Sequence, residues 1–176
     1  MRIPVVETER LILRAPTNDD FAVHRRTLMS DRARFVGGPY DLSGAWRDFC
    51  FDAAGWVLSG IGLWAIEERE TGLFCGTVGP NRPPFYPEIE FGWILSEEAE
   101  GRGIAYEAAH AARDYCYRNL GLMGLVSHID HGNERSKRLA TRLGARLDAD
   151  APRPEGAPDS FAIYRHPSPQ ELGIAA

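Results

Sequence analysis

Short stretches in which apolar residues alternate with polar ones, or run without interruption, recur along the chain and predict β-strands. Residues 88–95 alternate acidic and apolar side chains before becoming continuously apolar, which is typical of a strand that passes from solvent into a core. A turn at residues 69–72 joins two further stretches into a predicted hairpin. The strands predicted in this way lie at residues 8–16, 62–68, 73–79, 88–95, within 122–129 and at 161–165.

Helical spacing of apolar residues, with start and stop signals, predicts helices between these strands. The first begins at the capping sequence Thr17-Asn18-Asp19-Asp20, and the last begins at Asn133 and ends at Gly144. The predicted helices are residues 17–28, 43–58, 103–120 and 133–145. Because a helix separates the strand at 88–95 from the next one, these two strands are expected to be parallel neighbours joined by a right-handed crossover. This order of elements indicates a mixed α/β (α+β) fold.

Length and composition exclude several classes of protein. The 176 residues suit one domain, with a core at about residues 8–166 and a frayed tail at 167–176. The net charge of −5 argues against a nucleic acid partner. No apolar run suits a signal peptide or a membrane span, so we expect a cytoplasmic protein with no membrane partner. The three cysteines are widely spaced and are expected to be reduced.

A glycine-rich loop precedes the third predicted helix. Gly101 and Gly103 let the backbone approach a ligand without interference from a Cβ atom. The helix that begins near Gly103 directs its unpaired N–H groups and the positive end of its dipole at the same place. This arrangement suits a phosphate or pyrophosphate. The spacing matches neither the P-loop nor the dinucleotide-binding fingerprint, and a turn that needs glycine only for its shape is the alternative.

Four motifs carry a family resemblance. The loop Glu100-Gly101-Arg102-Gly103-Ile104-Ala105 is similar to the pattern Gln/Arg-x-x-Gly-x-Gly/Ala, with Glu100 in place of Gln or Arg. The opening Thr8-Glu9-Arg10-Leu11-Ile12-Leu13-Arg14 and the stretch Glu90-Phe91-Gly92-Trp93 are similar to strands of the same family, and Asn133-x-x-Ser136 is similar to the start of one of its helices. Together they resemble the GCN5-related N-acetyltransferases (GNAT), and in particular their RimJ/RimL-like branch.

The resemblance implies a fold and a cosubstrate. The fold is one GNAT-type domain with a mixed central sheet of about six to seven strands, helices on both faces, and a bulged fourth strand that splays from the fifth. The cosubstrate is acetyl-CoA, whose pantetheine arm would lie in the gap between these strands, and no metal is implied. The residues implied to bind it are Trp93, Ile94, Leu95, Gly101, Arg102, Gly103, Ile104, Ala105, Asn133 and Ser136.

Catalysis of acetyl transfer requires a base for the amine and a proton or hydrogen bond for the departing thiolate. Glu90 is the candidate base, with an exposed strand carboxylate as the alternative interpretation, and His128 is a second candidate. Many relatives carry a tyrosine acid where this chain has Ala140, which leaves Ser136 as the candidate donor to the sulfur. The backbone N–H near Ile94 is the candidate group to stabilise the oxyanion.

The acceptor is expected to be a primary amine, either of a small molecule or of a protein N-terminus. An α-amino group with a pKa of about 8 is roughly one-tenth neutral at pH 7, whereas a lysine amine is neutral less than about one time in a thousand. A site with weak base machinery therefore favours an amine of low pKa. A non-catalytic acyl-CoA-binding module and a generic phosphate-binding protein are the alternatives, and the protein is expected to be a monomer or a homodimer.

Overall fold

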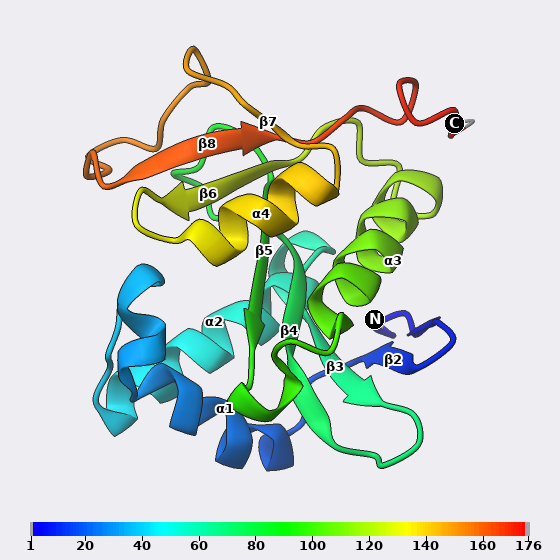
Figure 1. Cartoon of the computed structure of the whole chain (residues 1–176), viewed down its shortest axis with the longest axis vertical. Coiled ribbons are helices and arrows are strands. Elements are labelled where there is room, and N and C mark those ends of the chain that lie inside the picture. Colours follow the sequence, from blue (N-terminus) through cyan, green and yellow to red (C-terminus); the bar gives the residue numbers. More distant parts are fainter. Residues whose placement is uncertain (1, 175–176) are drawn as a thin grey trace.

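One mixed sheet runs through the whole molecule, as a computed structural model that describes residues 2–174 shows (Figure 1). Its strands are β1 (Val6–Glu7), β2 (Leu11–Arg14), β3 (Trp64–Glu68), β4 (Phe74–Asn81), β5 (Glu90–Leu95), β6 (Val126–Asp130), β7 (Arg146–Leu147) and β8 (Phe161–Arg165). The helices are α1 (Phe21–Leu28), α2 (Leu42–Ser59), α3 (Ile104–Arg118) and α4 (Glu134–Arg142). Three short 3₁₀ helices lie at η1 (Asn18–Asp20), η2 (Asp31–Phe35) and η3 (Glu97–Ala99).

The strands are ordered β1-β2-β3-β4-β5-β6-β8-β7 across the sheet. Only β5 and β6 pair in parallel among the described residues, and α3 connects them, so the predicted parallel crossover is confirmed. Within the described part of the chain the sheet has eight strands, slightly more than the six to seven expected. The two that the sequence pattern missed, β1 and β7, are two residues long each, which is too short to show any alternation.

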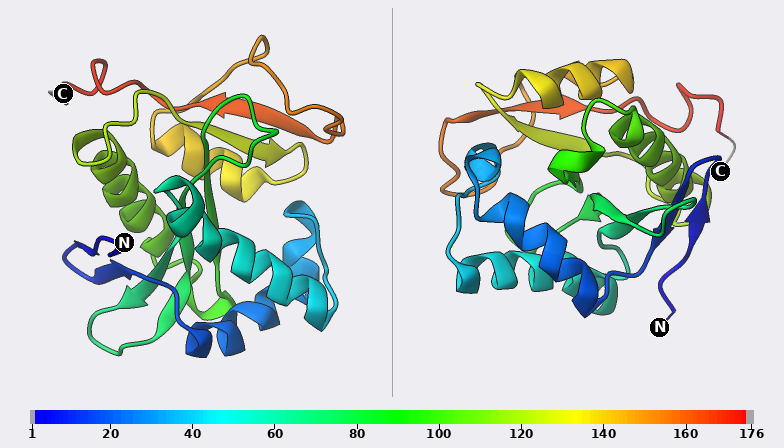
Figure 2. Two further views of the ribbon diagram at one scale, coloured as in Figure 1. Left: turned by 180° about the vertical axis from the view of Figure 1, so that it is seen from behind. Right: turned by 60° about the horizontal axis from the view of Figure 1, so that its bottom comes forward.

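Helices cover both faces of the sheet, as predicted. α3 and α4 lie on the face that is in front in Figure 1, and α1 and α2 lie on the opposite face, which Figure 2 shows from behind. Ala108, Ala109 and Ala112 of α3 are fully buried, and their small side chains let this helix pack closely on the sheet. No helix in the described part of the chain has both the length and the apolar character that crossing a membrane requires.

β5 and β6 separate after a single residue pair. Glu90 pairs with Val126, the Val126 amide donates to the Ile89 carbonyl at 3.0 Å, and the regular ladder stops there. The Ser127 hydroxyl then donates to the Phe91 carbonyl at 2.6 Å. On its other side β5 pairs with β4 in an unbroken register along its whole length. The predicted splaying is therefore confirmed, whereas the predicted bulge is absent from the β4–β5 register, and the register shift of the sheet lies between β3 and β4.

The chain after β8 folds back onto the molecule instead of fraying. Ile174 is only 5% exposed and belongs to the main core, with Leu172 packed against it. The Ile174 amide donates to the Pro169 carbonyl at 2.8 Å, which closes a turn. The prediction of a frayed tail is wrong for residues 167–174, because two isolated apolar residues anchor a segment rich in turn formers; residues 175–176 lie outside the described part.

Candidate active site

A groove of about 1070 Å³ crosses the molecule between the start of α3 and α4. The inner edge of β5 forms its floor, since Trp93, Ile94 and Leu95 line it where β6 has turned away. The loop before α3 closes one end, and one face of α4 forms the opposite wall along the whole helix. Strand backbone without a neighbouring strand has free N–H and C=O groups, so this floor suits an extended ligand that carries amides.

The loop at the end of the groove has the backbone shape that anion binding needs. Gly101 and Gly103 have φ values of +72° and +77°, which side chains with a Cβ atom rarely adopt. Gly103 is the N-cap of α3, and its carbonyl accepts from the Glu107 amide at 3.2 Å. The first amides of a 15-residue helix are thus directed at the groove with the positive end of the helix dipole.

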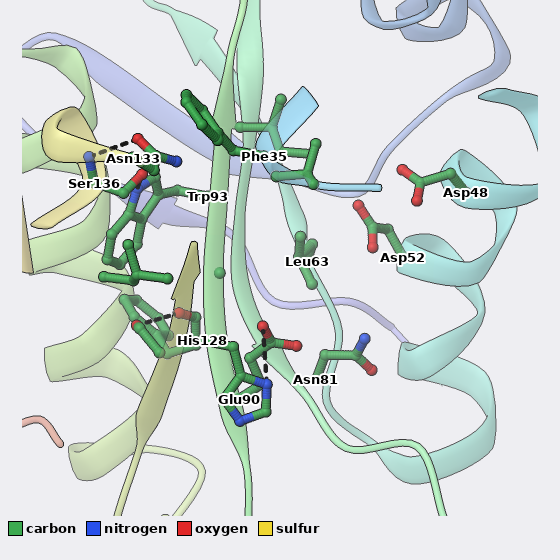
Figure 3. Close-up of a pocket in the computed structure, with 16 residues that line it drawn as sticks. Phe35, Asp48, Asp52, Leu63, Asn81, Glu90, Trp93, His128, Asn133 and Ser136 are labelled. Carbon is green, nitrogen blue, oxygen red and sulfur yellow. Dashed lines mark hydrogen bonds and ion pairs between the residues drawn. The ribbon is translucent and has the colours of Figure 1, made fainter. Parts of the chain in front are cut away.

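A smaller cavity of about 150 Å³ lies on the other side of β5, toward α2 (Figure 3). The groove and the cavity meet at the gap between β5 and the start of α4. The lining residues that they share are Phe35, Val36, Trp93, Ile94, Asn133 and Ser136. A ligand that extends along the groove therefore ends where a second ligand in the cavity begins.

Two neighbours hold Ser136 at this junction. Its amide donates to the Asn133 side chain at 3.1 Å, which is the N-cap bond of α4. Its hydroxyl oxygen accepts from the Trp93 indole N–H at 3.3 Å. Because Trp93 uses the acceptor side of the oxygen, the hydroxyl proton is left for another acceptor, such as a sulfur at the end of the groove.

Glu90 and His128 face each other at the far side of the cavity, with 3.6 Å between Glu90 Oε1 and His128 Nδ1. Burial raises the pKa of Glu90 to about 7. Burial, with a contribution from Arg153, lowers the pKa of His128 to about 4. The imidazole is therefore neutral at physiological pH, and the contact is not an ion pair. Tyr86 and Phe161 pack against the ring and keep it from water.

The GNAT acetyltransferase domain family matches residues 10–146, which is most of the chain. The chain belongs to this family.

Among solved structures, an acetyltransferase from Agrobacterium tumefaciens is 42% identical, with a TM-score of 0.88 over 95% of this chain and 96% of that chain. The Mycobacterium smegmatis RimJ structure with a CoA disulfide has the same fold, with a TM-score of 0.74 at 18% identity over 96% of this chain and 89% of that one. YkkB of Bacillus subtilis is 33% identical over 87 residues, 48% of this chain and 51% of YkkB, so the match spans about half of that relative.

The predicted family, its RimJ/RimL-like relatives and the enzyme class are therefore confirmed. GNAT acetyltransferases take their acetyl group from acetyl-CoA, which is the predicted cosubstrate. Nine of the ten residues predicted to bind acetyl-CoA line the groove: Trp93, Ile94, Leu95, Gly101, Gly103, Ile104, Ala105, Asn133 and Ser136. The exception is Arg102, whose side chain pairs with Glu68 of β3 and whose carbonyl accepts from Arg10, so it lies outside the groove lining.

The GNAT loop of this chain carries Glu100 where an uncharged or basic residue is usual, and two arginines compensate for it. Arg135 of α4 lies 2.5 Å from one carboxylate oxygen, and Arg32 of η2 pairs with the other. Three further arginines, Arg34, Arg138 and Arg142, line the same groove. The groove is therefore basic despite Glu100, which suits the phosphates of CoA. Sequence reasoning missed these cations because they come from segments far apart in the chain.

Sequence reasoning also missed two carboxylates of the cavity. Asp48 and Asp52 stand one turn apart on α2 and face the cavity from the side opposite Glu90 (Figure 3). Burial raises the pKa of Asp48 to about 6 and raises that of Asp52 well above its usual range. The spacing of four residues on a helix was the available signal. Ala140 is fully buried against Ile129 and Ala145, so this position points into the core.

Proposed function

We propose that this GNAT enzyme transfers the acetyl group of acetyl-CoA to a primary amine that binds in the small cavity, by direct attack within a ternary complex. The observation that carries the proposal is the shared lining of groove and cavity at Trp93, Ile94 and Ser136. A thioester at the end of the groove and an amine in the cavity meet there without any intermediate carrier. Proximity of this kind accounts for a large part of the rate of acyl transfer.

Acetyl-CoA binds with its pyrophosphate on the α3 N-terminus and the arginines of the groove, and with its pantetheine arm along β5. The free backbone edge of β5 takes the place that a strand would occupy, so the pantetheine amides hydrogen bond to backbone groups of Trp93 and Leu95. The thioester then lies near Ile94, where a backbone N–H stabilises the oxyanion of the tetrahedral intermediate.

Glu90 is the general base. The carboxylate takes a proton from the acceptor amine, directly or through one water, the amine nitrogen forms a bond to the acetyl carbon, and the bond from that carbon to sulfur breaks. A pKa of about 7 suits this role because the group is half ionised at neutral pH and still basic enough to accept the proton. His128, with its pKa of about 4, is the poorer base, and its ring serves to position Glu90.

Ser136 assists the leaving group. Its hydroxyl donates a hydrogen bond to the departing thiolate while Trp93 holds the oxygen in place. An alcohol is too weak an acid to protonate a thiolate fully, so the thiolate leaves with this hydrogen bond and takes its proton from solvent.

Glu90→Gln is the decisive test of the proposal. The amide has the size of the carboxylate but cannot accept the proton, so we expect release of CoA thiol with an amine acceptor to fall by about 10²- to 10⁴-fold. In the wild type kcat/KM should rise with pH through about 7 as Glu90 loses its proton, and this inflection should vanish in the variant. Titration calorimetry should show unchanged acetyl-CoA binding.

The competing function is a module that binds acyl-CoA without turning it over. Thiol release with no member of a broad amine panel, together with micromolar binding of acetyl-CoA, would favour that module. A protein that binds ATP in preference to acetyl-CoA would contradict both functions.

A further inference from the structure

Three polar atoms converge between α1 and α2, next to the cavity that Asp48 and Asp52 line. They are a ring nitrogen of His24 and one carboxylate oxygen each of Asp48 and Asp52, and all lie within 4.8 Å of one another. His24 is 1% exposed, and its Nε2 has no hydrogen-bond partner among residues 2–174. Asp52 Oδ2 is buried and likewise has none. Such atoms are costly to bury without a partner, so the His24 and Asp52 atoms can each take a further one.

The cavity also lacks a positive charge. Glu90, Asp48 and Asp52 all line it, whereas none of its lining residues is a lysine or an arginine. None of the ion pairs formed by residues 2–174 includes Asp48 or Asp52. Burial lowers the pKa of His24 to about 4, so its ring is neutral and one nitrogen is an acceptor. In the empty protein the raised pKa of Asp52 means that this carboxyl holds a proton. A bound cation would take the place of that proton.

The spread of the three acceptors fits an ammonium group. An –NH₃⁺ group donates three hydrogen bonds in tetrahedral directions, and with donor–acceptor distances of about 2.9 Å its acceptors stand about 4.7 Å apart. A metal ion with ligands at about 2.1 Å would bring the same atoms to about 3.4 Å from one another. The three atoms all lie within 4.8 Å of one another, so they can surround an ammonium nitrogen without rearrangement of the helices.

We propose that His24, Asp48 and Asp52 bind a second ammonium group of the acceptor, so that the acceptor is a small diamine. The inference rests on the proposed function, because it assigns the other amine of the same molecule to Glu90 across the cavity (Figure 3). A cavity of about 150 Å³ holds a molecule about the size of benzene, or roughly six non-hydrogen atoms. 1,4-Diaminobutane has that size.

The test compares acetylation of 1,4-diaminobutane with that of pentylamine, in which a methyl group replaces the second ammonium. Because the two amines differ in basicity, the measured quantity is how their ratio of kcat/KM changes between the wild type and each variant. Asp52→Asn and Asp48→Asn should each lower the diamine-to-monoamine ratio by about 10- to 100-fold, the usual effect of losing a charged hydrogen bond. Asp150→Asn removes the same charge from an exposed loop and should leave the ratio unchanged.

Direct binding gives a second measurement that does not depend on turnover. Titration calorimetry of the wild-type protein with 1,4-diaminobutane should show binding that weakens by about 10-fold or more in Asp52→Asn, with circular dichroism confirming that the variant is folded. An unchanged ratio, or equal binding by wild type and variant, overturns the diamine site. Tighter binding of Zn²⁺ or Mn²⁺ than of the diamine, lost in Asp52→Asn, overturns it in favour of a metal site.

The two proposals fail in different ways. In one outcome the enzyme acetylates both amines, and the Asp48 and Asp52 variants lower kcat/KM equally for each. That result would refute the diamine site and retain the proposed acetyltransferase activity. A peptide with a free N-terminus that is acetylated with higher kcat/KM than the diamine also removes the diamine site alone. Diamine binding without thiol release for any amine removes the proposed function and keeps the ammonium site.

Discussion

Ser136, the proposed hydrogen-bond donor to the leaving group, illustrates how the orientation of one hydroxyl depends on its neighbours. Asn133 holds its amide and Trp93 holds its oxygen, so the hydroxyl proton has one direction left, toward the junction of groove and cavity. Ser127 is the only other hydroxyl residue that lines the cavity among the described residues, and it is already bonded to the Phe91 carbonyl. The proposed hydrogen bond to the leaving group therefore has Ser136 as its one available hydroxyl among the described residues that line the cavity.

Ser136→Ala should lower kcat by about 10-fold, the effect of one neutral hydrogen bond, while the acetyl-CoA dissociation constant stays unchanged. Thiol release and titration calorimetry measure the two quantities. Ser160→Ala, at an exposed position outside the cavity, is the matched control. A loss as large as that expected for Glu90→Gln would mean that Ser136 is a full proton donor.

Asp52 is expected to destabilise the empty protein. Its pKa is raised in the folded state by burial and by the neighbouring carboxylates Asp48 and Glu90, so the folded state holds a proton that the unfolded state releases. Stability from such a group is lost as the pH rises above the usual range of an aspartate near 4. Asp52→Asn should therefore raise Tm at pH 8, by about 2–4 °C for each kcal/mol by which the free energy of unfolding increases. The increase in Tm should be smaller at pH 5, where the folded protein loses less of this stability.

Differential scanning calorimetry at the two pH values checks this prediction. Asp150→Asn, which removes an exposed carboxylate, should change Tm little at either pH. If Asp52→Asn lowered Tm at pH 8, the carboxylate would have a favourable partner in the empty protein, and the cluster would not lack a cation.

At the level of elements, the turn into α3 links backbone shape to the proposed binding of acetyl-CoA. Gly103 and Gly121 both have positive φ, +77° and +65°, and neither has a neighbour that a Cβ atom would strike closely. Only Gly103 lines the groove; Gly121 lies just after α3. Substitutions at the two positions should therefore cause similar backbone strain, but only the substitution at Gly103 should also affect contact with a ligand.

Gly103→Ala and Gly121→Ala should each lower the free energy of unfolding by about 1–2 kcal/mol, because alanine is strained at positive φ. Only Gly103→Ala should weaken acetyl-CoA binding, since it disturbs the amides at the helix N-terminus. Chemical denaturation and titration calorimetry measure the two effects. Equal weakening of acetyl-CoA binding by both variants would show that the loop acts through general stability.

The elements that sequence could predict are those with a local signal. The alternation of polar and apolar residues at 88–95 is enough to predict a strand that becomes buried. The two glycines at 101 and 103 are enough to predict a turn with an unusual backbone shape. Asp48 and Asp52 gave no comparable signal, since two acidic residues one turn apart are also typical of a solvated helix face. Only the packing of α2 against the sheet opposite Glu90 turns them toward a cavity. The ion pairs of Glu100 with Arg32 and Arg135 likewise depend on the tertiary fold, so they could not be predicted from the sequence.

At the scale of the molecule, the C-terminal segment completes the core. Leu172 and Ile174 are isolated apolar residues among turn formers, so no periodic pattern predicted their burial. Tyr117 of α3 donates to the Pro167 carbonyl at 2.9 Å, which fixes where the segment begins. The segment thereby covers the end of α3 that lies away from the groove.

Ile174→Ala should lower the free energy of unfolding by about 2–5 kcal/mol, as expected for truncating a buried aliphatic side chain. Leu58→Ala, at a residue that is 83% exposed, is the control and should change it by less than about 0.5 kcal/mol. Urea denaturation measures both. A small effect of Ile174→Ala would mean that the segment is dispensable for the fold.

The separation of β5 from β6 also bears on how long the protein survives in a cell. One ladder pair and the Ser127 hydroxyl join the two strands, so the sheet is weakest where acetyl-CoA is proposed to insert. A ligand that binds only the folded state stabilises it by about 2.7 kcal/mol at 100 times its dissociation constant. Chaperones and proteases act on the unfolded fraction, so the abundance of the enzyme should follow the supply of its acetyl donor. Starvation for that donor would then remove catalyst as well as substrate.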